Sequence, residues 1–146
     1  MFLRDMFRDY YVSPANPGTG FNLDFQLSAG QRVQLLAMSL LLTTDATAGD
    51  RRLALLIRRG STDFHLVQAQ TVQSPSTAVR YYIGPGNADD TAVISFRVRC
   101  RLPYPLEMWG SSTADQGWRI DSDVANLAAG DALTAINCHF RIAASG

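Results

Sequence analysis

The side chains that most often bind catalytic metals or act as nucleophiles are sparse in this sequence. His65 and His139 are its two histidines, and they lack the HxH or HExxH spacing that holds a catalytic zinc ion. Ser111 and Ser112 follow Gly110 in an expected turn, without the GxSxG pattern that places a nucleophile on a strained bend. We interpret both histidines as ordinary strand side chains and expect no metal ion, no cofactor and no serine nucleophile.

Paired carboxylates are the remaining candidates for chemistry. A glycosidase needs two of them across a cleft, and the sequence offers Asp121 with Asp123 on one predicted strand face and Asp89 with Asp90 in a loop. Solvated strand faces and turns account for both pairs. The segment GPGN at 84–87 lacks the GK[ST] ending and the following helix of a phosphate-binding loop. These patterns predict a protein that is not an enzyme and that works by binding another protein.

A row of arginines is the first feature that indicates such a binding surface. Arg97, Arg99 and Arg101 alternate with apolar residues, so a strand places all three on one face, roughly 7 Å apart. Three like charges repel one another unless acids lie opposite. Three interpretations stay open: a cross-strand ladder with Asp121 and Asp123, a basic strip for an acidic partner surface, or a nucleic-acid contact.

The N-terminal segment MFLRDMFRDYY is the second feature. Its apolar residues recur in pairs every four positions, with Arg-Asp pairs between them, which is typical of a short amphipathic helix. VSPANPGTG follows as a hinge with two Pro and two Gly. The segment either covers an open end of its own domain or reaches a neighbouring subunit. The partner-binding residues expected here are Phe2, Leu3, Met6, Phe7, Tyr10 and Tyr11.

Composition predicts one folded domain with few surface helices. The 146 residues match the usual size of a single domain, and 47% of them are hydrophobic, enough for a core without a disulfide or metal staple. All 13 basic residues are Arg, and Glu107 is the only Glu, whereas exposed helix faces usually carry Lys and Glu. The Arg bias reflects either a GC-rich genome or a use of Arg at protein interfaces. Cys100 and Cys138 are expected to be buried thiols, with a disulfide as the alternative.

Charge and hydropathy predict where the protein resides. The 13 basic and 13 acidic residues balance, which argues against a general attraction to nucleic acid or to an anionic membrane. Charges at positions 4, 5, 8 and 9 interrupt the N-terminal apolar run, unlike a signal peptide. The longest apolar stretch, Leu35 to Leu42, is too short to cross a bilayer. We expect a soluble protein made in a cytoplasm.

From Phe21 onward the apolar period is two, which predicts strands. We expect about eight short strands separated by Gly, Pro, Asp and Ser turns, a pattern that favours a β-sandwich or barrel. In the clearest strand, Ile94 to Leu102, the residues Ile94, Phe96 and Val98 are expected inward. The other strands are expected at Phe21 to Leu27, Val33 to Thr43, Leu53 to Ile57, Phe64 to Val72, Val79 to Ile83, Leu106 to Trp109, Trp118 to Val124 and Leu133 to Ile142. We place the N-terminal arm and hinge at 1–20 and the single domain at 21–146.

Four segments resemble small structural proteins of tailed bacteriophages, and most closely their jelly-roll capsid cement, or decoration, proteins. These segments are LTTDATAGDRRLALLI, SPSTAVRYYIGPG, LPYPLEMWGSS and AAGDALTAINCHFRI, and the resemblance covers roughly Gln31 to Ile142. The N-terminal arm has no counterpart in the resemblance. The resemblance implies an all-β, two-sheet antiparallel sandwich of jelly-roll type, made in a bacterial host cytoplasm and located on the capsid surface of a virion.

The same resemblance implies a mechanical function. The protein would bind the outside of the capsid, stabilise contacts between major capsid protein subunits, and form a homo-oligomer. No nucleic acid, membrane or small molecule is expected as a partner. The alternative is a tail, baseplate or fibre component with a receptor- or carbohydrate-binding role, in which Trp109, Trp118 or Tyr104 stacks on a sugar ring.

Overall fold

The protein is all-β over the residues described by the computed structural model, which are 7–27, 29–102, 106–110 and 117–143. These residues form ten strands and no helix, so none of them forms a helix able to cross a membrane. The strands are β1 (Phe7–Val12), β2 (Asp24–Gln26), β3 (Arg32–Thr43), β4 (Ala54–Arg59), β5 (Thr62–Gln68), β6 (Ala78–Gly84), β7 (Arg97–Arg101), β8 (Leu106–Trp109), β9 (Trp118–Ser122) and β10 (Ala132–Ala143).

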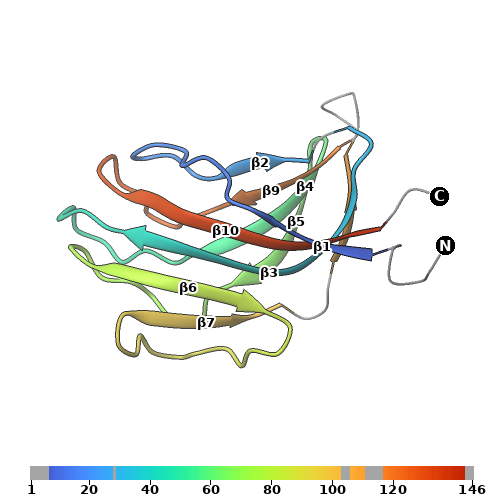
Figure 1. Ribbon diagram of the computed structural model, residues 1–146. Helices are drawn as coiled ribbons and strands as arrows, with labels where there is room; N and C mark the ends of the chain where they lie inside the picture. The colour runs from blue at the N-terminus through green and yellow to red at the C-terminus, as the bar shows by residue number, and fades with distance from the viewer. Residues whose placement is uncertain (1–6, 28, 103–105, 111–116, 144–146) are drawn as a thin grey trace.

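The strands form two sheets that pack face to face as a β-sandwich (Figure 1). The six-stranded sheet has the order β1-β10-β3-β6-β7, and β8 pairs with the first residues of β3. The four-stranded sheet has the order β2-β9-β4-β5. Every neighbouring pair is antiparallel except β6 and β7, which run parallel.

Four of the antiparallel pairs are nested in the sequence. β4 pairs with β5, β3 with β6, β2 with β9 and β1 with β10, each pair enclosing the one before. Two strands, β7 and β8, lie between β6 and β9 in the sequence and belong to none of these pairs. Residues 85–109 are therefore an insertion in the nested scheme, and we call them the β7–β8 insertion.

The core lies between the two sheets and follows from the apolar alternation. Four buried residues of β3 point inward: Val33, Leu35, Leu40 and Leu42. Phe140 of β10 is fully buried in the same core cluster. Burying one such side chain stabilises the fold by roughly 2 kcal/mol. A buried core of this size, with both sheets contributing, explains why the sandwich needs no disulfide.

The two cysteines are buried free thiols, as expected. Cys138, Met38, Ile83 and Cys100 are register partners in one row across β10, β3, β6 and β7. At the usual strand spacing the two Cα atoms are about 14 Å apart, whereas a disulfide needs them within about 7 Å. The disulfide alternative is therefore wrong for this fold.

The helix expected for the N-terminal segment is wrong for residues 7–11. Phe7 to Val12 form an edge strand that pairs along its whole length with β10. In a strand, Tyr10 and Tyr11 point to opposite faces, and each has a ring to stack on, at Phe140 and His139 respectively. The pairing with β10 supplies inter-strand hydrogen bonds and ring contacts. A helix of this length without such contacts is only marginally stable in water. The arm boundary at residue 20 stays a prediction.

One cluster of buried charges joins the loop that follows β3 to the loop that precedes β10. Arg51 is fully buried, and its five N–H groups all donate hydrogen bonds: three to carboxylates and two to the carbonyls of Thr47 and Gly49. The carboxylates are Asp131, which is also fully buried, and Asp45. Burial opposes ionisation of Asp131, but the bonds from Arg51 and from backbone N–H groups outweigh it and lower the pKa of Asp131. We call this group the Arg51 cluster.

Candidate functional site

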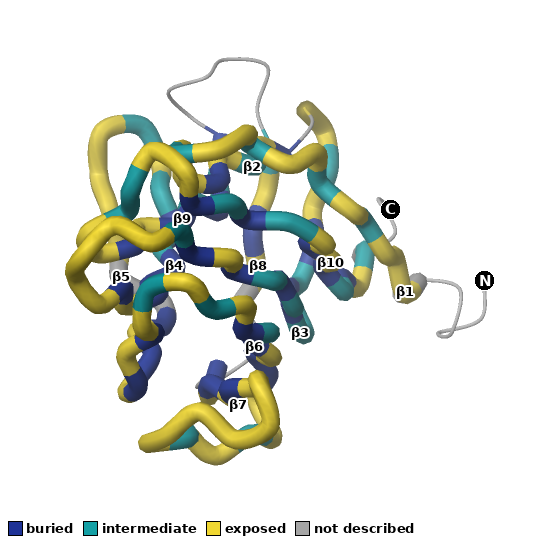
Figure 2. The backbone as a smooth tube through the Cα atoms, turned by 90° about the vertical axis from the view of Figure 1, so that its left-hand side faces the viewer, coloured by how far each residue is buried: buried dark blue, intermediate teal, exposed yellow. Residues whose placement is uncertain are grey.

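The three arginines predicted to share a face do so on β7. Arg97, Arg99 and Arg101 are exposed, and they alternate with the buried Val98 and Cys100. Strand β7 is the last strand of the six-stranded sheet, so these guanidinium groups lie at its edge on the outer face. Figure 2 shows β7 and the preceding loop at one side of the molecule, largely exposed.

The ladder expected with Asp121 and Asp123 is wrong, because Asp121 lies on β9 in the other sheet and Asp123 directly follows that strand. Asp121 pairs in register with Asp24 instead, and burial together with the hydrogen bond to Asp24 raises its pKa to about 6. A cross-strand ladder needs neighbouring strands of one sheet, and β7 and β9 belong to different sheets.

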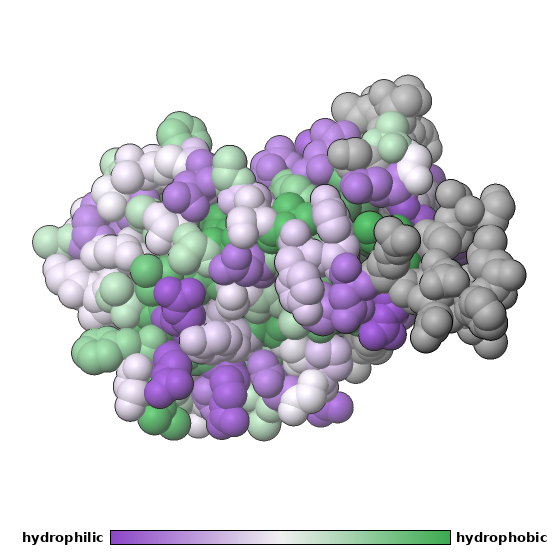
Figure 3. Space-filling view, viewed as in Figure 1, coloured by the Kyte–Doolittle hydropathy of each residue, from purple (hydrophilic) through white to green (hydrophobic). Residues whose placement is uncertain are grey.

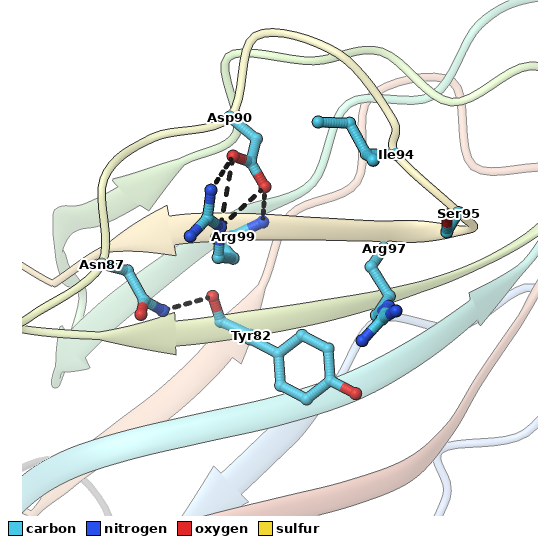
Figure 4. Close-up of a pocket in the computed structure, with 7 residues that line it drawn as sticks. All are labelled: Tyr82, Asn87, Asp90, Ile94, Ser95, Arg97 and Arg99. Atoms are coloured by element: carbon cyan, nitrogen blue, oxygen red, sulfur yellow. Dashed lines mark hydrogen bonds and ion pairs between the residues drawn. The ribbon is translucent and has the colours of Figure 1, made fainter.

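Acids of the β7–β8 insertion take the place of that ladder. Asp90 accepts hydrogen bonds from the Arg99 side chain, with Nη2 to Oδ1 at 3.0 Å, and from the Arg99 backbone N–H at 2.7 Å (Figure 4). Asp89 accepts one from the backbone N–H of Arg101 at 2.7 Å. These hydrogen bonds lower the pKa of Asp90. Because they also occupy the outer edge of β7, they block the addition of a further strand there.

The other arginines on this surface are not paired with acids. Within the described residues, no ion pair is made by the guanidinium of Arg97, Arg101 or Arg80. Arg80 lies directly opposite Arg97 in the neighbouring strand β6. The surface therefore carries an excess of positive charge although the whole chain is neutral.

The apolar residues just before β7 are exposed, contrary to the expectation that Ile94 and Phe96 point inward. The backbone N–H and carbonyl groups of Ile94 and Arg97 bond each other at 3.0 Å, which closes a two-residue turn at Ser95 and Phe96. Ile94 is 61% exposed, Phe96 71% and Val93 38%. We call Val93 to Phe96 the apolar tip.

The turn at the apolar tip is strained. Ser95 and Phe96 both have positive φ angles, 52° and 61°, as a type I′ turn requires. Such turns usually carry Asn-Gly, and a residue with a Cβ costs about 1 kcal/mol or more in this conformation. Ser-Phe carries no turn signal, and for that reason the sequence pattern predicts a strand start at Ile94, three residues before β7 begins.

Two shallow hollows extend from the apolar tip across the outer face of the six-stranded sheet (Figure 3). The first, of about 430 Å³, lies between the apolar tip and Tyr82, and the second, of about 400 Å³, continues to Tyr11 on β1. Tyr82 and Asn87 line both. The second has a floor of small residues that includes Ala37 and Ser39.

At its far end the second hollow is bordered by Tyr11, a predicted partner-binding residue, and by His139, which Tyr11 contacts. Tyr11 is 72% exposed and stacks on His139, with ring centroids 4.5 Å apart. Tyr10 points to the other face of the sheet, toward Phe140. Phe2, Leu3 and Met6 lie outside the described residues, as does the side chain of Phe7.

A separate aromatic cluster lies near one end of the sandwich. Trp109 and Trp118 pack edge to face with centroids 5.4 Å apart, and Phe64 lies 6.2 Å from Trp118. The guanidinium of Arg59 stacks over both indole rings. Trp109 is 40% exposed and Phe64 52%. Tyr104, the third aromatic residue proposed to stack on sugar, lies outside the described residues.

Metal-ligand and thiol side chains are scattered among the described residues. In them, no three His, Cys, Asp or Glu side chains gather closely enough to hold a metal ion. Burial raises the pKa of each cysteine thiol to about 12, so at neutral pH neither is a thiolate. The side chain of His139 lies on the sheet surface, with its Nε2 atom 3.5 Å from Oδ2 of Asp9.

Comparison of the chain with models of known protein families, with curated proteins and with solved structures finds no match.

Proposed function

We propose that this protein is a structural component of a phage particle, binding the outside of the capsid and stabilising contacts between major capsid protein subunits. The observation that carries the proposal is the position of the exposed apolar tip and the Arg row. Both belong to the β7–β8 insertion, in which Val98 and Cys100 face the core while the tip and the guanidinium groups are exposed. Exposed side chains that the core does not use, yet that the fold holds in a fixed and strained position, are typical of a binding surface.

The strand order supports a jelly roll as the fold type in this proposal. A jelly roll has eight strands in two sheets, and it can be described as a long hairpin rolled up, with its outermost strands paired last. The nested pairs β4–β5, β3–β6, β2–β9 and β1–β10 follow that scheme. In this description β1 is the first strand of the domain, and β7 and β8 are additions between the sixth and seventh strands.

A stiff sandwich suits the mechanical task. A capsid is held together by many weak contacts and is pushed outward by the packed DNA. A protein that spans the joint between subunits adds buried apolar area, at about 25 cal/mol per Å² before the costs of association. The gain per copy is modest, but it is multiplied over many sites, and neighbouring copies in a homo-oligomer increase the avidity.

A second candidate function is supported by the aromatic cluster. Trp109 and Phe64 expose ring surface beside Trp118, as a sugar-binding platform does. In that case the protein belongs to the tail, baseplate or fibre and contacts carbohydrate on the host. Arg59 already covers part of both indole rings, which leaves less ring surface for a sugar and favours the capsid proposal.

Immunogold electron microscopy of particles from the source, with an antibody to this chain, separates the two candidates. The capsid proposal predicts gold spread over icosahedral heads. Gold confined to tails would support the second candidate instead. If no particle carries any gold label, both the capsid proposal and the second candidate are contradicted.

A further inference from the structure

The apolar tip is the most exposed apolar group on the surface that the proposed function uses. Ile94 and Phe96 expose most of their side chains, and Val93 adds to the same patch. In Figure 4, Ile94 and Ser95 lie at the start of β7, at one side of the hollow, with Arg97 beside them. Exposed apolar side chains that cluster in a folded protein mark interaction sites more often than isolated ones do.

The tip is held in place before any partner arrives. Paired backbone bonds between Ile94 and Arg97 close its base, and the Asp90 backbone N–H donates to the Arg99 carbonyl at 3.0 Å. The bonds from Arg99 to the Asp90 carboxylate tie the same loop to β7 a second time. A preorganised loop loses little conformational entropy on binding, so its apolar residues can act as anchors.

Positive charge exceeds negative charge beside the tip, although Asp89 and Asp90 lie in the same insertion. Arg97 follows it directly, Arg80 lies opposite Arg97, and Arg101 is further along the same strand face. Two copies of the chain that met through this surface in a symmetric pair would bring these arginines against each other, which is unfavourable. The charge therefore indicates a different protein with acidic side chains, not a second copy of this one.

We infer that the apolar tip inserts Phe96 and Ile94 into an apolar pocket of the partner, and that carboxylates around that pocket pair with Arg97 and Arg101. The inference rests on the proposed function, in which the partner is the major capsid protein, and it adds the chemistry of the contact. Phe96 is the anchor because its ring is the largest apolar group in the tip and is 71% exposed.

The substitution Phe96→Gly tests the inference without disturbing the fold. Glycine adopts the positive φ of this turn without strain, so the variant should fold at least as well as the parent. It removes the whole ring from the contact. The matched control is Phe21→Ala, because Phe21 is 66% exposed in a loop away from the β7–β8 insertion.

Binding is measured by co-sedimentation of each purified chain with capsid shells made of the major capsid protein alone, and folding by thermal melting. The inference predicts that Phe96→Gly binds about 30-fold more weakly than the parent at an unchanged or higher melting temperature. Phe21→Ala should bind like the parent. If Phe96→Gly binds as tightly as the parent, the inference is wrong and the proposed function stands. If the parent chain itself does not sediment with the shells, the proposed function is wrong, and the inference fails with it.

Discussion

Two groups of arginines in this protein show opposite environments. Arg51 is fully buried, and all five of its N–H groups have acceptors within its own chain. The β7 arginines are exposed, and of the three only Arg99 has a carboxylate partner among the described residues. The same side chain therefore ties loops together in one place and presents unpaired donors in the other.

The comparison shows why a count of arginines says little about function. A buried guanidinium is tolerated only when its donors are satisfied, so the Arg51 cluster is explained by the fold itself. The fold gives no such reason for Arg97 and Arg101, whose removal leaves no buried group unpaired. Carboxylates on a partner surface would supply the ion pairs that Arg97 and Arg101 do not make with the described residues of their own chain.

The largest expected effect comes from the substitution Arg51→Ala. It leaves Asp131 buried and ionised without its main partner, so the melting temperature should fall by roughly 10 °C or more. The matched control is Arg52→Ala at the exposed neighbouring position, which should change the melting temperature little. Thermal melting followed by circular dichroism checks both variants, and equal effects in the two would remove the distinction between buried and exposed arginines.

The next effect is the loss of stability in acid. The folded state holds the pKa of Asp131 below the ordinary value of 3.8, so its contribution is present above that pH and is lost as the pH falls below it. Asp121 acts in the opposite sense, because its pKa is raised to about 6 and its contribution is lost as the pH rises toward that value. The melting temperature should therefore be highest at about pH 4, where Asp131 is ionised in the folded state and Asp121 is still protonated.

A single control variant assigns the acid loss to one of the two arginine groups. Asp90 also has a lowered pKa, but it lies at the surface beside Arg99. We expect Asp90→Asn to lose stability in acid almost as the parent does. A variant whose melting temperature no longer falls below pH 4 would show that the exposed pair, not the Arg51 cluster, causes the loss.

Much of this fold follows from patterns that are local in the sequence. Apolar runs and the period of two predict β3, β4, β6 and β10 closely, although β3 buries one face more fully than the other, and the alternation within β7 places its three arginines on one face. Those features depend on neighbouring residues alone. The expected sandwich follows from the number and spacing of such strands.

The features that sequence analysis missed depend on distant partners or on unusual turns. The N-terminal pairs of apolar residues fit a helix until β10 is known to lie beside them, since Tyr10 and Tyr11 then each find a ring on a separate face. Arg51 and Asp131 are 80 positions apart, and nothing near either residue signals the other. The apolar tip was missed because Ser95 and Phe96 form a turn that usually carries Asn-Gly.

The contrast between the buried Arg51 and the exposed β7 arginines is tested most directly by reversing the charge of Arg97 and Arg101, which make no ion pair with the described residues. The double substitution Arg97→Glu with Arg101→Glu should leave the melting temperature within about 2 °C of the parent, because neither side chain has an ion-pair partner to lose. Binding to capsid shells, measured by co-sedimentation, should fall by about tenfold or more, since like charges would then face each other. Unchanged binding, or a loss of stability as large as that of Arg51→Ala, would contradict the account.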